Sequence, residues 1–197
     1  MPSTLTAADA LQQLKAGNAR FVSGSRRTNP FHDGIAALAG GQNPFAIVLG
    51  CSDSRVPIET IFDQDPGNVF VVRVAGNFAN NDNLGSIEYG VEVLGARLVL
   101  VLGHARCGAV TAALDYVRDG VGQRGHIQEL VEAVAPAVRA TRGFPGDWLE
   151  NAVAYNVALN VRAVLAGSKI VSDLAEAGQV QVTGGIYSLS TGIVTFT

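Results

Sequence analysis

The chain has 197 residues, 48% of them hydrophobic and 16% charged, which suffices for one domain (1–197) with a sizeable core. The net charge is −3, and no Lys/Arg run or basic stretch with interleaved aromatic residues is visible, which argues against a nucleic acid partner. The long apolar stretch 148–166 is interrupted by charged and amide residues, so it is typical of an amphipathic helix and argues against a membrane partner.

The first 44 residues predict a helical arm followed by a connector. Apolar residues from Leu11 to Val22 recur at helical spacing, and Thr6 followed by Asp9 resembles an N-terminal capping box. Residues 23–44 are rich in Ser, Gly, Asn and Pro, so we expect irregular structure there. The apolar face of the arm has little sequence-adjacent structure to cover it.

From residue 45 onward, strand and helix patterns alternate. Apolar runs predict strands at 45–50, 68–75 and 96–102. A short helical segment near 57–62 and a clear one from Leu84 to Leu94 separate them. This order favours an α/β fold with a mostly parallel central sheet flanked by helices.

The second half predicts helices and then a final pair of strands. Helical patterns run from Cys107 to about Arg118 and over 126–141, 148–166 and 169–177. Pro136 predicts a kink or break in the second of these helices, while Asp147 and Ser168 are suited to cap the third and fourth. The runs 180–187 and 193–196 predict a strand and its hairpin partner, which would form a C-terminal antiparallel edge.

One motif match is better explained by local structure. Gly120-Val-Gly122-Gln-Arg-Gly125 fits the dinucleotide-binding fingerprint, which requires a strand before it and a helix directly after it. A predicted helix precedes it here, so we interpret Gly120 as a helix stop and the rest as a flexible loop. No nicotinamide cofactor is expected from it.

The two cysteines each follow a predicted strand. Cys51 follows the run 45–50 and begins Cys51-Ser-Asp53-Ser-Arg55, and the other cysteine ends His104-Ala-Arg-Cys107. Two thiols, one imidazole and one carboxylate are therefore expected near the ends of core strands, where open α/β sheets form active sites. Thiolate and imidazole are typical zinc ligands.

The spacing within each motif has its own meaning. Cys51, Asp53 and Arg55 can share one side of an extended segment, so the carboxylate has a choice between the metal and the guanidinium. His104 and Cys107 would lie one turn apart if a helix starts there. A thiol in that first turn would feel the positive end of the helix dipole, which favours its thiolate.

Two other interpretations of the cysteines are a disulfide and simple burial. The chain begins Met1-Pro-Ser-Thr-Leu-Thr without a basic segment followed by an apolar one, so we expect a cytoplasmic protein, in which disulfides are rare. If the cysteines were simply buried, the presence of His, Asp and Arg beside them would be a coincidence. A metal site is therefore favoured, although three protein ligands are also compatible with a structural one.

Three further polar residues are assigned other roles. His32 and His126 match no ligand pattern and are interpreted as surface residues. Arg73 stands alone in an apolar strand, and because an unpaired buried charge is costly we expect it to pair with a carboxylate.

The paired motifs, 53 residues apart from Cys51 to His104, resemble those of the β-class carbonic anhydrases. The likeness continues through segments 65–73, 86–91 and 184–187 and covers nearly the whole chain. The resemblance implies the following site: zinc ligands Cys51, His104 and Cys107; a catalytic dyad of Asp53 and Arg55; and substrate-cleft residues Gln42, Phe70 and Tyr89. It also implies a homodimer or dimer-based tetramer, whose N-terminal helices embrace partner subunits and whose clefts draw on both subunits.

The reaction implied is the reversible hydration of carbon dioxide to bicarbonate and a proton by a zinc-bound hydroxide. Zinc would lower the pKa of its water toward about 7. Asp53 is a possible fourth ligand in a closed state, but one branch that regulates itself in this way has a tryptophan where this chain has Val48. Together with Gln42, Val48 predicts an open state in which Asp53 pairs with Arg55.

Two alternative functions remain open at this level. Relatives of this family hydrolyse carbonyl sulfide or carbon disulfide with the same ligands, and motif matching does not separate these substrates from carbon dioxide. The second alternative is a non-catalytic zinc-binding or redox module, which would leave Asp53 and Arg55 without a role.

Overall fold

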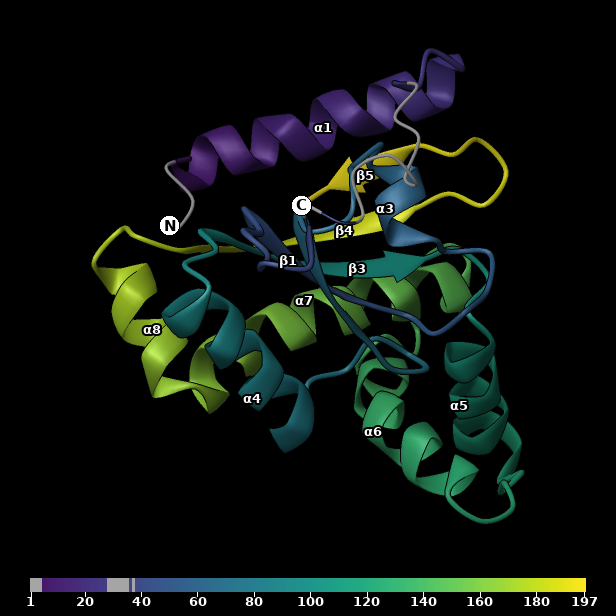
Figure 1. Cartoon of the computed structure of the whole chain (residues 1–197). Helices are drawn as coiled ribbons and strands as arrows, with labels where there is room; N and C mark the ends of the chain where they lie inside the picture. The colour runs from purple at the N-terminus through teal and green to yellow at the C-terminus, as the bar shows by residue number, and fades with distance from the viewer. Residues whose placement is uncertain (1–4, 28–35, 37) are drawn as a thin grey trace.

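The computed structural model describes residues 5–27, 36 and 38–197, and a five-stranded sheet lies at its centre (Figure 1). The strands are β1 (Ala46–Gly50), β2 (Val69–Arg73), β3 (Leu98–His104), β4 (Gln181–Tyr187) and β5 (Val194–Phe196). Their order is β2-β1-β3-β4-β5, and all neighbours are parallel except β4 and β5. This arrangement confirms the predicted α/β fold with its antiparallel C-terminal edge.

Helices cover both faces of the sheet (Figure 1). On one face lie α1 (Ala7–Ser23) and α3 (Ile58–Ile61). On the opposite face lie α4 (Asn81–Glu88), α7 (Trp148–Gly167) and α8 (Lys169–Glu176), and α5 (Gly108–Asp119) and α6 (Ile127–Ala140) pack beside α7. Among the described helices, none is both long enough and apolar enough to cross a bilayer.

The central strands β1 and β3 are buried on both faces. Side chains at alternate strand positions point to opposite faces. Val48 and Leu100 accordingly pack toward α1 and α3, whereas Leu49 and Val101 pack toward α7. Burial on both faces explains why these strands appear in the sequence as continuous apolar runs. The ends of β1 and β3 are thereby held in a fixed relation to each other.

Helix α1 packs against its own chain. Its capping box is present as predicted, with Thr6 and Asp9 bonded to each other. Gly17 lies so close to α3 that an added Cβ would be 1.7 Å from the Phe62 carbonyl oxygen. The buried Asn18 side chain donates to Gly192 O at 2.8 Å and accepts from Val194 N at 2.9 Å. Segments distant in sequence therefore cover much of the apolar face of the arm.

Other helix ends also follow the sequence predictions. Asp147 and Ser168 accept hydrogen bonds from backbone N–H groups of α7 and α8, respectively, and Gly120 ends α5 with a left-handed φ of 71°. The predicted connector at 23–44 lies partly outside the described residues; within them, α1 continues to Ser23.

Two local predictions need correction. The helix expected from Leu84 to Leu94 changes at Tyr89 into a π-helical turn, η1 (Tyr89–Val93). Of the kink or break predicted at Pro136, the break does not occur, because α6 runs from Ile127 to Ala140 through it. Proline removes the bond to the carbonyl four residues earlier. That residue, Glu132, is exposed like Pro136 itself, so water can satisfy the free carbonyl.

Candidate metal centre

Cys51, His104 and Cys107 meet at the carboxyl ends of the two central strands. Cys51 follows β1, and His104 is the last residue of β3, the parallel neighbour of β1. Helix α5 begins at Gly108, in agreement with the helical pattern predicted after Cys107, so His104 lies on the strand and not one helical turn before Cys107. Cys107 is instead the residue before the first helical turn, and the intervening Arg106 takes a left-handed φ of 53° to make the bend.

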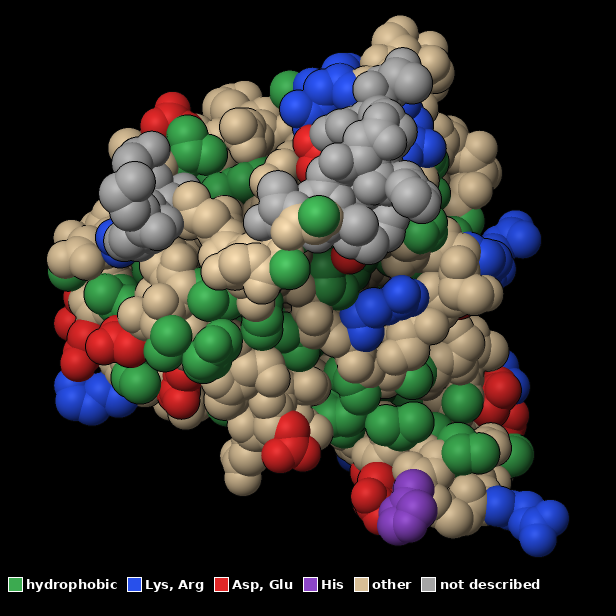
Figure 2. All heavy atoms as spheres, in the orientation of Figure 1, with side chains coloured by type: hydrophobic (Ala, Val, Ile, Leu, Met, Phe, Trp, Pro, Cys, Tyr) green, Lys and Arg blue, Asp and Glu red, His purple; other side chains and the backbone are tan. Residues whose placement is uncertain are grey.

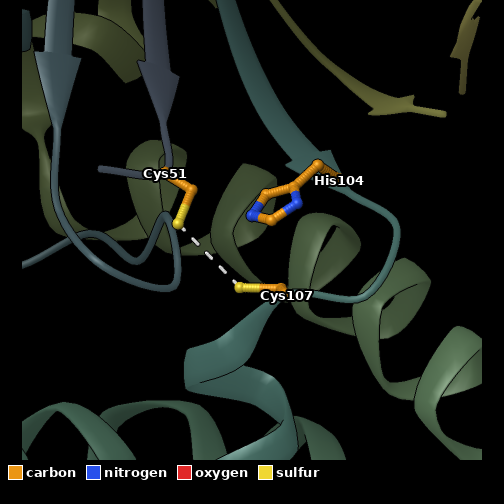
Figure 3. A group of neighbouring side chains, drawn as sticks. All are labelled: Cys51, His104 and Cys107. Atoms are coloured by element: carbon orange, nitrogen blue, oxygen red, sulfur yellow. Dashed lines mark hydrogen bonds between the residues drawn. The ribbon is translucent and has the colours of Figure 1, made fainter. Parts of the chain in front are cut away.

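These three residues form a closely spaced group, here called the Cys–His–Cys group. One sulfur or nitrogen atom of each lies within 4.8 Å of those of the other two, and the two sulfurs are 3.9 Å apart. All three residues are buried, His104 completely. Figure 3 shows the two thiols and the imidazole directed toward one another. The group has the composition and size of a site for a thiophilic divalent cation.

The imidazole of His104 is oriented as a ligand would be. Its Nδ1 lies 3.0 Å from the carbonyl oxygen of Ala105, which can only accept, so Nδ1 carries the proton. Its Nε2 is buried and has no hydrogen-bond partner among the described residues. A buried nitrogen lone pair without a partner is costly, and a bound metal ion would satisfy it.

The two thiols interact strongly. The hydrogen bond between the two thiols is the largest influence on Cys51 and, against the effect of burial, lowers the pKa of the Cys51 thiol. His104 and the Gly76 amide act in the same direction, and Gly76 N lies 3.4 Å from Cys51 Sγ. The same thiol–thiol bond and burial raise the pKa of Cys107. The two sulfurs are placed to bind one divalent cation together, and such binding requires both thiols to lose their protons.

Asp53 and Arg55 form a bidentate ion pair beside this group. Arg55 donates from Nε to Oδ1 of Asp53 at 2.9 Å and from Nη2 to Oδ2 at 2.7 Å. These bonds hold the pKa of Asp53 well below its usual range. The Asp53 Oδ2 atom is 3.9 Å from His104 Nε2. The carboxylate is thus ionised and placed at the edge of the Cys–His–Cys group.

Arg73 was expected to pair with a carboxylate, and this prediction is wrong. Its guanidinium donates instead to two backbone carbonyls, from Nε to Cys51 O at 2.9 Å and from Nη2 to Asp53 O at 2.7 Å. Arg73 is the last residue of β2 and lies opposite Gly50, where the chain leaves β1. It therefore holds the loop that carries Cys51 and Asp53.

Comparison with known proteins agrees with this geometry. The family model described as carbonic anhydrase matches residues 46–194. Carbonic anhydrase 2 of Mycobacterium tuberculosis is 42% identical over 194 residues, which cover 98% of this chain and 93% of that protein. The β-carbonic anhydrase of Coccomyxa, solved with acetazolamide, is 28% identical with a TM-score of 0.71, and the match covers 96% of this chain and 82% of that one. The chain belongs to the β-class carbonic anhydrases.

Other members of the class have the same fold. One of two tetrameric β-carbonic anhydrases from Sordaria macrospora is 26% identical with a TM-score of 0.68, and the match covers 95% of this chain and 96% of that one. Carbonic anhydrases are enzymes whose general reaction is the hydration of carbon dioxide. The Cys–His–Cys group of this β-class enzyme is able to hold a metal ion.

The three expected cleft residues do not lie at the Cys–His–Cys group of the same chain. Gln42 precedes β1, beside residues 66–68, and Cys51 follows the other end of that strand. Phe70 pairs with Ile47 near the start of β1. The ring of Tyr89, 48% exposed as a residue, has its centroid 6.2 Å from that of Phe70. All three lie toward the amino ends of the strands.

Of the two histidines outside the Cys–His–Cys group, the structure describes only His126. His126 is a surface residue as predicted; its side chain is 95% exposed and its Nδ1 lies 2.8 Å from Glu129. His32 lies outside the described residues.

Sequence reasoning missed the backbone amide of Gly76 that donates to Cys51. The signal available in the sequence was the presence of a glycine at position 76, because glycine is favoured where the backbone takes a positive φ, here 89°.

A cavity of about 540 Å³ adjoins the Asp53–Arg55 pair. Its lining includes two arginines, two serines and two acidic residues: Arg55, Arg106, Ser188, Ser190, Asp147 and Glu150. The guanidinium groups provide hydrogen-bond donors and the carboxylates provide acceptors, so the cavity beside the dyad carries charges of both signs.

Proposed function

We propose that the Cys–His–Cys group holds zinc and that this enzyme catalyses the reversible hydration of carbon dioxide at that site. The observation that carries the proposal is the buried Nε2 of His104, which faces two thiols and has no hydrogen-bond partner among the described residues. Two thiolates and a neutral imidazole match the sulfur and nitrogen ligands that zinc prefers, and they leave a fourth position open.

The chain's own residues have separate roles in this proposal. When bound, zinc supplies a Lewis acid that lowers the pKa of a water toward about 7, so that hydration can proceed near neutral pH. Asp53 accepts a hydrogen bond from the reacting water, since its Oδ2 lies only 3.9 Å from His104 Nε2. Arg55 keeps that carboxylate ionised and in place.

The same pairing supports an open resting state. An Asp53 that gives two acceptor oxygens to Arg55 would lose charge-assisted hydrogen bonds if it turned to the metal as a fourth ligand. Val48 is fully buried in the core of β1 and provides no hydrogen-bond donor for an anion. We therefore assign the open, water-accessible form to this enzyme.

Assembly would complete the substrate cleft. Gln42, Phe70 and Tyr89 lie away from the Cys–His–Cys group of their own chain, so we propose that they line the cleft of a partner subunit in a homodimer or dimer-based tetramer. The exposure of Tyr89 at 48% and Val93 at 62% supports such an interface. Figure 2 shows hydrophobic side chains at the surface over α4 and α6. The related Sordaria macrospora enzymes are tetrameric.

We also propose a cytoplasmic location. Cys51 and Cys107 are unpaired, with their sulfurs 3.9 Å apart. An oxidising compartment would favour their disulfide before metal is bound, whereas the cytoplasm keeps thiols reduced.

The deciding experiment measures metal content and turnover in one purified sample. We expect about one zinc per chain, since the residues that the structure describes form one such ligand set. We expect carbon dioxide hydration by stopped-flow pH-indicator assay, and carbonyl sulfide hydrolysis is assayed in parallel to compare the two substrates. A Cys51–Cys107 disulfide in freshly isolated native protein would contradict the metal site, and faster turnover of carbonyl sulfide would overturn the assignment of substrate.

A further inference from the structure

The segment between β2 and α4, residues 74–80, lies against the Cys–His–Cys group. The Gly76 N–H in this segment donates to Cys51 Sγ at 3.4 Å, in a buried environment. Donors that bond a ligand sulfur orient it and stabilise its anionic form. The quality of this bond depends on how firmly the backbone around Gly76 is held.

Two buried asparagines of α7 hold this segment. Asn156 Nδ2 donates to Gly76 O at 2.9 Å, and Asn160 Oδ1 accepts from Ala79 N at 2.8 Å. The two side chains are joined, because Asn160 Nδ2 donates to Asn156 Oδ1 at 3.1 Å and to Asn156 O at 2.8 Å. Both ends of the turn are thus bonded to one helix.

The residue types indicate that these bonds matter to the segment more than to the helix. Asparagine is a poorer helix former than alanine, and burying an amide is costly unless it is hydrogen-bonded. Asn156 is 1% exposed and Asn160 is 4% exposed, yet both lie inside α7. Their side chains offset these costs through bonds to the backbone of residues 76 and 79.

Packing holds Gly76 as well. Its φ is 89°, and an added Cβ would lie 2.8 Å from Val134 and 3.3 Å from Ala109. The side chains of α6 and α5 therefore press on the same residue whose carbonyl is bonded to Asn156. This leaves the adjacent Gly76 N–H directed at the sulfur.

We propose that Asn156 is a positioning residue of the metal centre, which holds the Gly76 carbonyl so that the Gly76 amide stays bonded to Cys51 and slows metal release. The inference rests on the proposed function, because it takes the Cys–His–Cys group to be a zinc site. Asn160 supports Asn156 in this role through the bond between their side chains.

The test compares Asn156→Ala with Asn151→Ala. Asn151 is a matched control: it lies on the same helix and its Nδ2 also donates to a carbonyl, that of Pro145 at 3.0 Å, which is not part of the group. We expect Asn156→Ala to release zinc to excess chelator about 10-fold faster, since outer-shell partners contribute about 10–100-fold to metal affinity. Asn151→Ala should release zinc at the wild-type rate.

Spectroscopy and unfolding separate positioning from general destabilisation. In cobalt-loaded protein, the sulfur-to-metal charge-transfer band should shift in Asn156→Ala and not in Asn151→Ala. A merely structural role would instead lower the unfolding temperatures of metal-free and metal-loaded protein equally and leave the release rate unchanged, and this result would overturn the proposal. If Asn156→Ala does not fold, Asn156→Leu is used, since leucine fills the space of the asparagine side chain but has no hydrogen-bond donor.

The failure of this inference is distinguishable from failure of the proposed function. Wild-type protein without zinc or carbon dioxide hydration would overturn the proposed function before any variant is made. A zinc-loaded, active wild type together with unchanged release in the folded Asn156 variant would overturn the positioning role alone.

Discussion

Both carboxylate oxygens of Asp53 accept hydrogen bonds from the guanidinium of Arg55, at 2.9 Å for Oδ1 and 2.7 Å for Oδ2. A backbone bond from Arg55 N to Oδ1 at 2.9 Å adds to this pairing. Bidentate bonds between charged groups fix orientation as well as distance. The carboxylate is therefore held as an acceptor at the edge of the Cys–His–Cys group.

The Asp53→Asn substitution tests this role. We expect the variant to keep its zinc and to lose about 100-fold or more of carbon dioxide hydration, since positioned proton acceptors contribute about 10²–10⁴-fold. The amide has only one oxygen, so it cannot accept both hydrogen bonds from Arg55. It also carries no negative charge with which to accept a hydrogen bond from the reacting water as the carboxylate does. Stopped-flow hydration and metal analysis on the same sample measure both effects.

Cys107→Ala is the matched comparison for the dyad variant. It should lose the metal itself, because it removes one of the three ligand atoms that lie within 4.8 Å of one another. Wild-type turnover of Asp53→Asn across the pH range would show that the proposed role of the dyad is wrong.

The pH dependence of stability should reveal a second ion pair, at Asp63. Burial raises the pKa of this carboxyl, but hydrogen bonds and charge from Arg20 and Arg27 outweigh burial and lower the pKa overall. Because the folded-state pKa is lowered, the ion pair contributes its full stability at pH values above the ordinary carboxyl pKa of about 4. This stability is lost as the pH falls through the folded-state pKa. Asp63→Asn should therefore lose about 2 kcal/mol near neutral pH.

Denaturant unfolding from about pH 8 down to about pH 3 measures this difference. The gap between wild type and Asp63→Asn should be constant above about pH 5 and should shrink below about pH 4. Asp119→Asn is the control, because Asp119 pairs with Arg118 at an exposed site where ion pairs contribute little. A gap that widens toward acid would contradict the assigned pKa direction.

The pH–rate profile tests the open state assigned to Asp53. Arg55 holds the carboxylate, and the Val48 side chain offers no hydrogen-bond donor to an anion. Activity should therefore decline gradually with falling pH, as expected when a single group becomes protonated. Added bicarbonate should not deepen that decline beyond product inhibition. Profiles at low and high bicarbonate measure this, and a cooperative drop below neutrality that bicarbonate deepens would mean that Asp53 caps the metal.

The state of assembly tests the proposed partner cleft. Light scattering at micromolar concentration should give a mass at least twice that of one 20.5 kDa chain. Val93→Asp should shift the protein toward monomer, since Val93 is 62% exposed on the same turn as Tyr89. Val121→Asp, at a 49% exposed loop residue, should not. A wild-type mass near that of one chain would disprove the assembly.

Local sequence patterns carried enough information for most of the fold and for the centre of the site. Apolar runs of strand length predicted the sheet, and side chains at Thr6, Asp147 and Ser168 predicted helix starts, because caps are bonds between residues three apart. The meeting of Cys51 with the His104–Cys107 motif was also predictable. Cys51 directly follows β1 and the motif begins at the last residue of β3, and the carboxyl ends of these parallel strands share one edge of the sheet.

Contacts between distant segments were beyond the reach of these patterns. The sequence shows an arginine alone in an apolar strand and an asparagine inside a helix, but not their partners. Only the packed structure shows that Arg73 donates to the carbonyls of residues 51 and 53 and that Asn156 donates to the carbonyl of Gly76. Likewise, Pro136 is tolerated because Glu132 faces solvent. Periodicity reports which face of an element is apolar, whereas a polar group's partner depends on which backbone atoms packing brings within hydrogen-bond distance.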